Sequence, residues 1–114
     1  MQNPRPERGT DFEQRASVFA ALGDGTRLSL VGKLASGPPQ SISRLAEGST
    51  LTRQAITKHL RVLEDAGVVQ GIRVGRENLF ELRPEPLKEL RSYLEQVSAQ
   101  WEDALARLKS FVER

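Results

Sequence analysis

Apolar residues recur along most of this chain at intervals of three and four, the spacing that places them on one face of a helix. The pattern predicts four helices in the first two thirds of the 114 residues. A longer apolar series of the same kind follows toward the C-terminal end. The four predicted helices span about residues 12–22, 25–35, 42–47 and 52–66.

Residues suited to helix ends lie at these predicted boundaries. Asp24, Ser41 and Thr52 each precede a predicted helix, where a side-chain oxygen can accept a hydrogen bond from an unpaired backbone N–H. Gly23 and Gly67 follow the first and fourth helices, and glycine is common after the last turn of a helix. The boundary residues therefore agree with the apolar pattern on where the helices begin and end.

Two short segments instead alternate between apolar and polar residues, which is typical of β-strands. They span Val68–Val74 and Asn78–Leu82, with Gly75, Arg76 and Glu77 at the tip of the hairpin between them. A last helix then runs from the prolines after the second strand to about residue 112. The predicted fold is mainly α with one β-hairpin, in the order α-α-α-α-β-β-α. Two short helices joined by a turn and followed by a hairpin form a winged helix-turn-helix.

The outer face of the fourth predicted helix carries side chains suited to DNA. The apolar residues of this helix lie on one side of a helical projection, and the other side is polar or cationic. Arginine pairs well with guanine edges and glutamine with adenine edges in the major groove. A solvated face without a ligand is the alternative. We expect DNA contacts from this helix and its surroundings by Arg44, Thr52, Arg53, Gln54, Thr57, Lys58 and Arg61.

The hairpin predicts a second contact with DNA. Arg73 and Arg76 flank Gly75, which lets the tip turn tightly. Two cations on a projecting loop can bind phosphate or enter the minor groove, but ordinary surface arginines show the same pattern.

The last helix carries apolar residues at alternating intervals of three and four, which is a heptad pattern. Such a seam can pack on its own domain, but four short helices can cover only part of one this long. We therefore predict a homodimer in which the first helix joins the last one at the interface. The predicted interface contains Phe12, Ala16, Phe19, Leu90, Leu94, Val97, Trp101, Leu108 and Phe111.

Composition bears on metals and catalysis. The chain has no cysteine and one histidine, His59, so thiolate sites are excluded and we expect no metal and no cofactor. His59 lies on the apolar face of its helix, where a packed, hydrogen-bonded histidine is commoner than a ligand or a pH sensor. Without a cysteine nucleophile or a complete phosphate-binding loop around Gly23-Asp24-Gly25, we do not expect an enzyme.

Charge and hydropathy bear on location and partners. The net charge of +2 indicates nucleic acid only weakly. No apolar run is long enough for a membrane span, and the polar N-terminus lacks the apolar stretch of a signal peptide, so we expect a cytoplasmic protein. Residues 1–11 have the composition of a disordered arm, in which Arg5 and Arg8 could touch DNA, and residues 12–114 form one domain for DNA binding and dimerisation.

Three stretches resemble the ArsR family of bacterial repressors. LTRQAITKHLRVLEDAGVV, at Leu51–Val69, looks like the recognition segment of that family. FAALGDGTRLSLVGKL, at Phe19–Leu34, resembles its second-helix signature, and RVGRENLFEL, at Arg73–Leu82, resembles its wing. The similarity covers about residues 12–112. Gly25 departs from the family, which usually has a residue such as Glu or Pro there.

The resemblance implies a dimeric repressor whose affinity for double-stranded DNA falls when an effector, here of unknown identity, binds. Two DNA-binding units related by a two-fold axis predict an inverted-repeat operator. Many members sense metals through paired cysteines on the third or recognition helix, or through Asp and His on the last helix. Neither set matches this sequence, so the branch without metal-binding cysteines is the better match.

Overall fold

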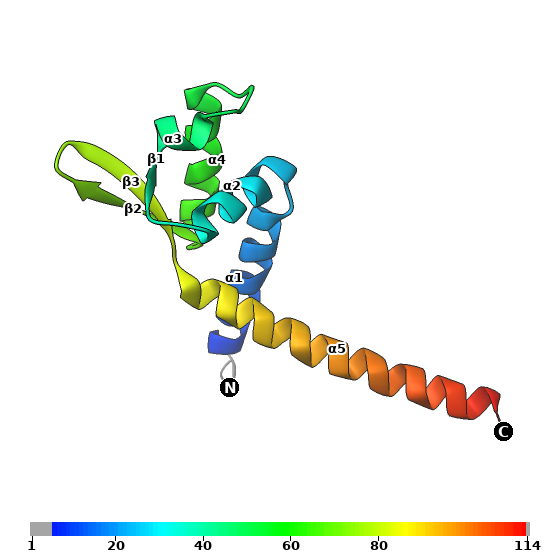
Figure 1. The fold of residues 1–114 in the computed structure, drawn as a ribbon. Helices are drawn as coiled ribbons and strands as arrows, with labels where there is room; N and C mark the ends of the chain where they lie inside the picture. The colour runs from blue at the N-terminus through cyan, green and yellow to red at the C-terminus, as the bar shows by residue number, and fades with distance from the viewer. Residues whose placement is uncertain (1–5, 114) are drawn as a thin grey trace.

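The computed structural model describes residues 6–113, with side chains from residue 11 onward. It confirms a mainly helical winged helix-turn-helix with an antiparallel hairpin (Figure 1). The elements are α1 (Pro6–Leu22), α2 (Gly25–Ala35), β1 (Gln40–Ser41), α3 (Ile42–Ala46), α4 (Arg53–Asp65), β2 (Val69–Val74), β3 (Glu77–Leu82) and α5 (Pro84–Val112). We call residues 25–82 the reading head and residues 94–112 the C-terminal arm.

The three predicted N-terminal caps are confirmed. The side chains of Asp24, Ser41 and Thr52 each accept a hydrogen bond from the backbone N–H three residues later, at 3.1, 3.1 and 3.0 Å. Gly67 has a φ of 82°, a left-handed conformation that favours glycine and ends α4. Local sequence therefore determines where the helices of the reading head begin.

α1 begins at Pro6, earlier than the helix predicted from Phe12. Residues 6–11, which we expected to belong to a disordered arm, are therefore helical. Proline is favoured at the first helical position because its φ is already helical and no intrahelical partner is needed for its nitrogen. The contact suggested for Arg5 and Arg8 lies outside the described residues and side chains.

The hairpin is one residue tighter than predicted. Val74 pairs with Glu77, so only Gly75 and Arg76 form the tip, and Glu77 belongs to β3. Gly75 has a φ of 61°, and a left-handed first residue is typical of a two-residue hairpin turn.

The sequence did not predict β1, which adds a third strand in the order β1-β3-β2. Gln40 pairs with Phe80 and Ser41 with Leu79. Two residues are too short to show an alternating pattern, so this strand exists because the fold places them beside β3.

The core lies inside the reading head, with contributions from α1 and the first turns of α5. The apolar face of α4 supplies its centre, and every member is nearly or fully shielded from solvent. The buried cluster contains Val18, Ala21, Leu30, Leu34, Leu45, Ile56, Leu60, Leu63, Ala66, Val68, Val69 and Leu90.

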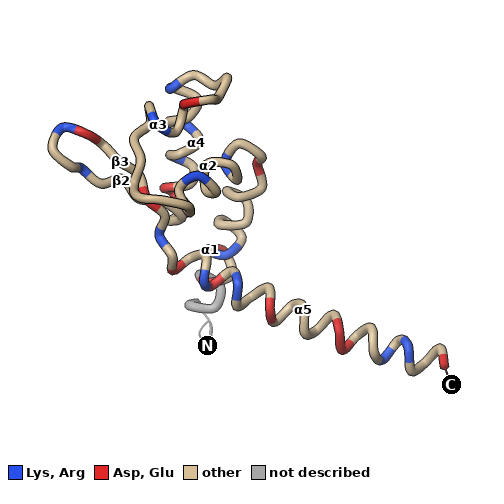
Figure 2. The backbone as a smooth tube through the Cα atoms, viewed as in Figure 1, with Lys and Arg blue, Asp and Glu red and all other residues tan. Residues whose placement is uncertain are grey.

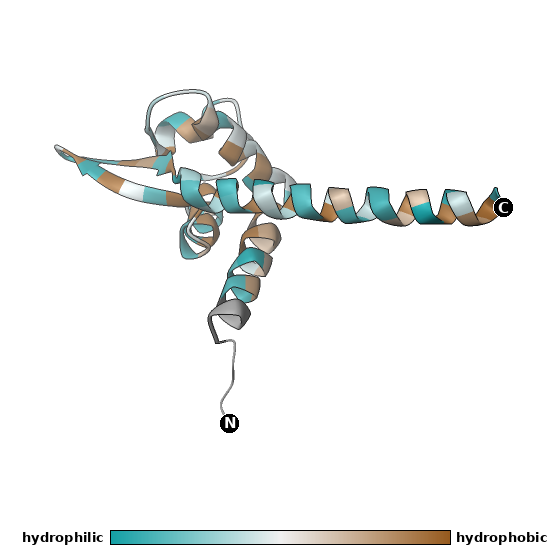
Figure 3. Ribbon diagram, turned by 90° about the horizontal axis from the view of Figure 1, so that it is seen from below, coloured by the Kyte–Doolittle hydropathy of each residue, from teal (hydrophilic) through white to brown (hydrophobic). Residues whose placement is uncertain are grey.

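α5 packs on this core only at its N-terminal end and then leaves the rest of the chain as an arm (Figures 1 and 3). The radius of gyration is 18.9 Å, whereas a compact chain of this length has about 13 Å. The elongated shape therefore comes from a helix that extends beyond the core of its own chain.

Candidate nucleic-acid interface

α4 separates its buried and exposed side chains onto opposite faces. Ile56, Leu60 and Leu63 are fully buried against the core. The predicted contacts Arg53, Gln54, Lys58 and Arg61 are all exposed. The same helix is thus anchored by one face and presents donors and cations on the other, as a helix that enters a groove must.

The two threonines of the predicted contact set are already engaged within the protein. Thr52 is exposed, and its hydroxyl oxygen caps α4 through the N–H of Ala55. Thr57 is half-buried, and its hydroxyl donates to the carbonyl of Arg53 at 2.8 Å. Both hydroxyls keep unused bonding capacity, but their first role in the structure is to shape the N-terminal turns of α4.

α3 lies before α4, and its end is held by a residue that the sequence reasoning missed. The ammonium group of Lys33, in the last turn of α2, donates to the carbonyl of Leu45 at 3.1 Å. A carbonyl at a helix C-terminus has no intrahelical partner, so a cation there is favourable. Arg44 remains exposed on α3, where it was predicted to contact DNA.

The wing is fixed to α4 at its base. A carboxylate oxygen of Glu64, in the last turn of α4, accepts from the N–H of Gly71 at 3.3 Å. Arg73 on β2 and Arg76 at the tip are exposed, farther along the hairpin. The helix and the two wing cations therefore form parts of one connected unit.

The cations of this unit keep their charge available. Figure 2 shows lysine and arginine on α3, on α4 and on the hairpin. Within residues 11–113, Arg91, which pairs with Glu95, is the only lysine or arginine in an ion pair. The predicted phosphate contacts are thus not neutralised by neighbouring carboxylates.

A cluster of polar side chains joins α4 to the helices behind it. The guanidinium of Arg27 donates to the carbonyl of Ala21 at 2.6 Å and lies 3.3 Å, Nη1 to Nδ1, from the ring of His59. Asp24 Oδ2 lies 3.9 Å from the same Nδ1. The Arg27 backbone N–H is the main cause that lowers the pKa of Asp24; partial desolvation opposes it, and the charges of Arg27 and His59 add to it.

His59 therefore differs from the packed histidine that the sequence favoured. It is hydrogen-bonded, but its side chain is 25% exposed and it lies at a junction of three helices, not in the core. The missed partner was Arg27, because nothing local connects two residues that are 32 positions apart.

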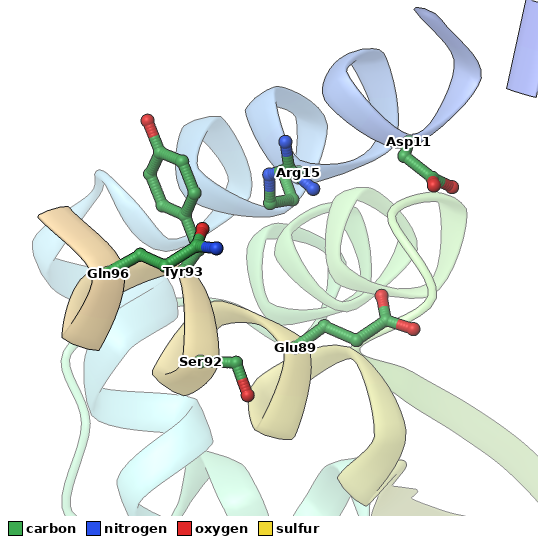
Figure 4. A pocket seen from close by; sticks show the side chains of 6 residues that line it. All are labelled: Asp11, Arg15, Glu89, Ser92, Tyr93 and Gln96. Carbon is green, nitrogen blue, oxygen red and sulfur yellow. The ribbon is translucent and has the colours of Figure 1, made fainter. Parts of the chain in front are cut away.

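A hollow lies between α1 and α5, away from the reading head (Figure 4). It has a volume of about 440 Å³ and is lined by the polar residues shown in Figure 4, namely Asp11, Arg15, Glu89, Ser92, Tyr93 and Gln96. The guanidinium carbon of Arg15 lies 4.8 Å from the centre of the Tyr93 ring, and Phe19 meets that ring edge-on at 6.0 Å. These contacts join α1 to α5 close to the predicted dimer interface.

Among the residues described, no group of three His, Cys, Asp or Glu side chains is placed to hold a metal ion. The described helices also include none that is long and apolar enough to cross a membrane.

Comparison with known proteins agrees with this geometry. A family model described as a helix-turn-helix domain matches residues 22–72. The HTH-type transcriptional regulator YuzN of Bacillus subtilis, itself uncharacterized, is 39% identical over 80 residues, which are 65% of this chain and 87% of that protein.

Solved structures of the same fold cover nearly the whole chain. An ArsR-like transcriptional regulator from Rhodococcus sp. RHA1 superposes with a TM-score of 0.77 at 39% identity, over 90% of this chain and 95% of the other. The homodimeric winged helix-turn-helix DNA-binding domain of Mb0332 from Mycobacterium bovis has a TM-score of 0.69 at 21% identity, over 90% and 94% of the two chains. The second likeness concerns the fold alone.

Proposed function

This chain belongs to the ArsR family of winged helix-turn-helix transcription regulators, and we propose that it acts as a homodimeric repressor that binds an inverted-repeat operator. The observation that carries the proposal is the exposed polar and cationic face of α4 beside an arginine-bearing wing. Its relatives are transcription regulators, and the proposal includes no catalytic step. We expect it to act in the cytoplasm.

We assign different roles to the exposed residues of the reading head. Arg53 and Gln54 lie in the first turn of α4, and the N-terminal residues of a recognition helix commonly contact base edges. Lys58 and Arg61 lie farther along the same face and fit phosphate contacts, as do Arg44 on α3 and the two wing arginines. Thr52 and Thr57 complete the proposed surface.

The apolar side chains that the chain leaves uncovered support the proposed dimer. In the C-terminal arm, Leu94, Trp101 and Leu108 are 52%, 63% and 59% exposed. Soluble monomers seldom expose a continuous apolar surface of this kind. Leu105 and Val112 extend the exposed surface beyond the predicted heptad positions. A second copy that packs along this seam would cover it.

The first helix supplies the rest of the proposed interface. Phe12 and Phe19 are exposed, as is Ala16 between them. Of the α5 residues proposed for the interface, Leu90 is already buried in its own chain and Val97 is half-buried. We therefore place the main dimer contact on the arm and on α1. Leu90 would contribute indirectly, by packing α5 against the core of its own chain.

Four measurements test the proposal. Fluorescence anisotropy with duplex DNA at several salt concentrations should show tight binding that weakens steeply with salt, because each phosphate contact releases counterions. Light scattering should show a dimer at micromolar concentration. Sequencing of the DNA that the purified protein retains should yield an inverted repeat, and a reporter gene behind that repeat should be repressed. A monomer, or binding without sequence preference, would contradict the proposal.

A further inference from the structure

We infer that His59 is a proton-sensitive positioning residue, which holds α4 against α1 and α2 when neutral and lowers DNA affinity when protonated. The inference rests on the proposed function, since it concerns regulation of the same DNA-binding surface. It starts from the position of His59 on the side of α4 opposite the exposed cations, where its ring contacts Arg27.

Arg27 connects three helices through one guanidinium group. Its Nε donates to the carbonyl of Ala21 and its Nη2 lies 3.5 Å from the carbonyl of Ala20, both in the last turn of α1. The carbonyl of Ala20 also accepts from the backbone N–H of Gly23 at 3.2 Å, so the guanidinium adds a further donor at the C-terminal end of α1. Its Nη1 faces Nδ1 of His59 on α4 at 3.3 Å. The Arg27 side chain, which extends from the start of α2, therefore contacts both the last turn of α1 and α4.

The contact between Arg27 and His59 requires a neutral imidazole. Arginine keeps its proton throughout the accessible pH range and offers only donors. Nδ1 must therefore accept, which places the ring proton on Nε2. In this state α4 is tied to the C-terminal end of α1 through a charge-assisted hydrogen bond.

Protonation exchanges the partner of His59. A proton on Nδ1 would place two donors and two positive charges 3.3 Å apart. The carboxylate of Asp24, whose Oδ2 is 3.9 Å from the same nitrogen, is the acceptor within reach. Protonation thus breaks the link from α4 through Arg27 to α1 and favours a link to the N-terminal cap of α2.

The charges around His59 are few. Asp24 and Arg27 face it from α2, and the described contacts from α1 are the two carbonyls that bind Arg27. On α4 itself, the residues one turn away, Ala55 and Leu63, are apolar. Histidine is the side chain that ordinarily changes charge between about pH 5 and 8, and this chain has one. A histidine-dependent effect of pH can therefore be assigned to His59.

The consequence for DNA binding comes from the geometry of a dimer. In the proposed homodimer, α1 belongs to the interface, so the link from α1 to α4, together with the packing of both helices in the core, sets the separation of the two recognition helices. Two half-sites have a fixed spacing. Loss of the link lowers affinity for the intact operator more than affinity for DNA of random sequence.

The main test compares the wild type with His59→Gln between about pH 5.5 and 7.5 at constant ionic strength. The amide oxygen of glutamine can accept from Arg27, but the side chain does not titrate. We expect similar operator affinities near neutral pH, and at the acidic end a wild-type affinity on the order of tenfold lower than that of the variant. Identical pH profiles for the two proteins would overturn the inference.

Asp24→Asn keeps the inference testable even where His59→Gln fails to fold. Asparagine caps a helix as well as aspartate does, but it carries no charge to attract a protonated imidazole. The midpoint of the affinity loss should move to lower pH in this variant. An unchanged midpoint would show that Asp24 is not the acceptor and would contradict the exchange of partners.

A measurement without DNA separates this inference from the proposed function. In the NMR spectrum of the full chain, the His59 ring and the Arg27 Nε–H signal should titrate together. If the two signals titrate together and the protein binds no DNA at any pH, the proposed function is wrong, but the exchange of the His59 partner from Arg27 to Asp24 stands. If DNA binds and Arg27 does not respond to the titration of His59, the inference is wrong and the proposed function stands.

Discussion

The reading head and the C-terminal arm differ in whether their regularly spaced apolar side chains are buried. In the reading head, Leu45, Ile56 and Leu63 are fully buried by other parts of the same chain. In the arm, Leu94, Trp101 and Leu108 are more than half exposed, although the apolar residues of the arm are spaced as regularly as those of the reading head. A regular apolar pattern therefore predicts an apolar face of a helix, but it does not show whether the chain itself buries that face.

The difference also separates stability from assembly. Burial of a leucine side chain stabilises a folded chain by about 1.5–3 kcal/mol relative to exposure. The reading head gains this within one chain, with the help of α1 and the start of α5. The arm can gain it only on association, and its contribution then depends on protein concentration.

The largest effect is expected from charges placed on the arm. Replacing Leu94 and Trp101 together with glutamate should give monomers, because two carboxylates cannot be buried in an apolar seam. Operator affinity should fall at least about 100-fold, since the two half-sites are no longer bound together. Light scattering and anisotropy titration would measure the two effects.

The matched control for this variant places the same charges on the opposite side of α5. Ala99→Glu with Ala106→Glu has the same spacing, and both alanines are exposed. This control should remain dimeric and bind the operator. A Leu94 and Trp101 double variant that still forms dimers would show that the seam is not the interface.

A single core truncation should have the next largest effect. Leu60 is 1% exposed, and Leu60→Ala should lower the free energy of unfolding by about 2–5 kcal/mol, because it leaves a cavity in the reading head. Leu108→Ala is the comparison. In urea unfolding, Leu108→Ala should leave the free energy of unfolding unchanged when it is added to the monomeric Leu94→Glu, Trp101→Glu variant. An equal loss for both substitutions in that monomer would show that the arm packs on its own chain.

The elements of the reading head could be predicted because their signals are local. Asp24, Ser41 and Thr52 each cap a helix within three residues of sequence. The faces of α4 follow from a period of 3.6 residues, and the extent of α5 follows from its prolines and its heptads.

The features that could not be predicted are contacts between distant residues. The strand β1 depends on β3, which lies about forty positions later. Lys33 binds a carbonyl of α3, and Arg27 reaches α4. Each looks like an ordinary surface residue in the sequence, and only the packing of the helices determines its partner. The start of α1 at Pro6 has another cause, because proline suits the first turn of a helix even within a polar segment whose composition is typical of a disordered arm.

Base specificity should respond to the first turn of α4. Replacing Arg53 or Gln54 with alanine should cost about 1–3 kcal/mol at the operator and relax the preference for one base pair. Lys58→Ala and Arg61→Ala are the controls, because loss of a phosphate contact weakens binding to all sequences about equally. Titrations against operators with single base changes would measure both. Full site preference in the Arg53 and Gln54 variants would show that other residues read the bases.

The smallest effect is expected from the wing. Arg76 is exposed at the tip of the hairpin. Glu64 of α4 holds the hairpin only at its base, through Gly71, so we expect the tip to contact the DNA backbone without a closely fitted interface. Arg76→Glu should flatten the slope of log K against log salt by roughly one unit or more, because fewer counterions are released. Arg107→Glu makes the same change of charge on the arm and should leave the slope unchanged. The slope reports the number of phosphate contacts and not the contacts with bases. An unchanged slope for Arg76→Glu would therefore show that the tip of the wing does not contact phosphate.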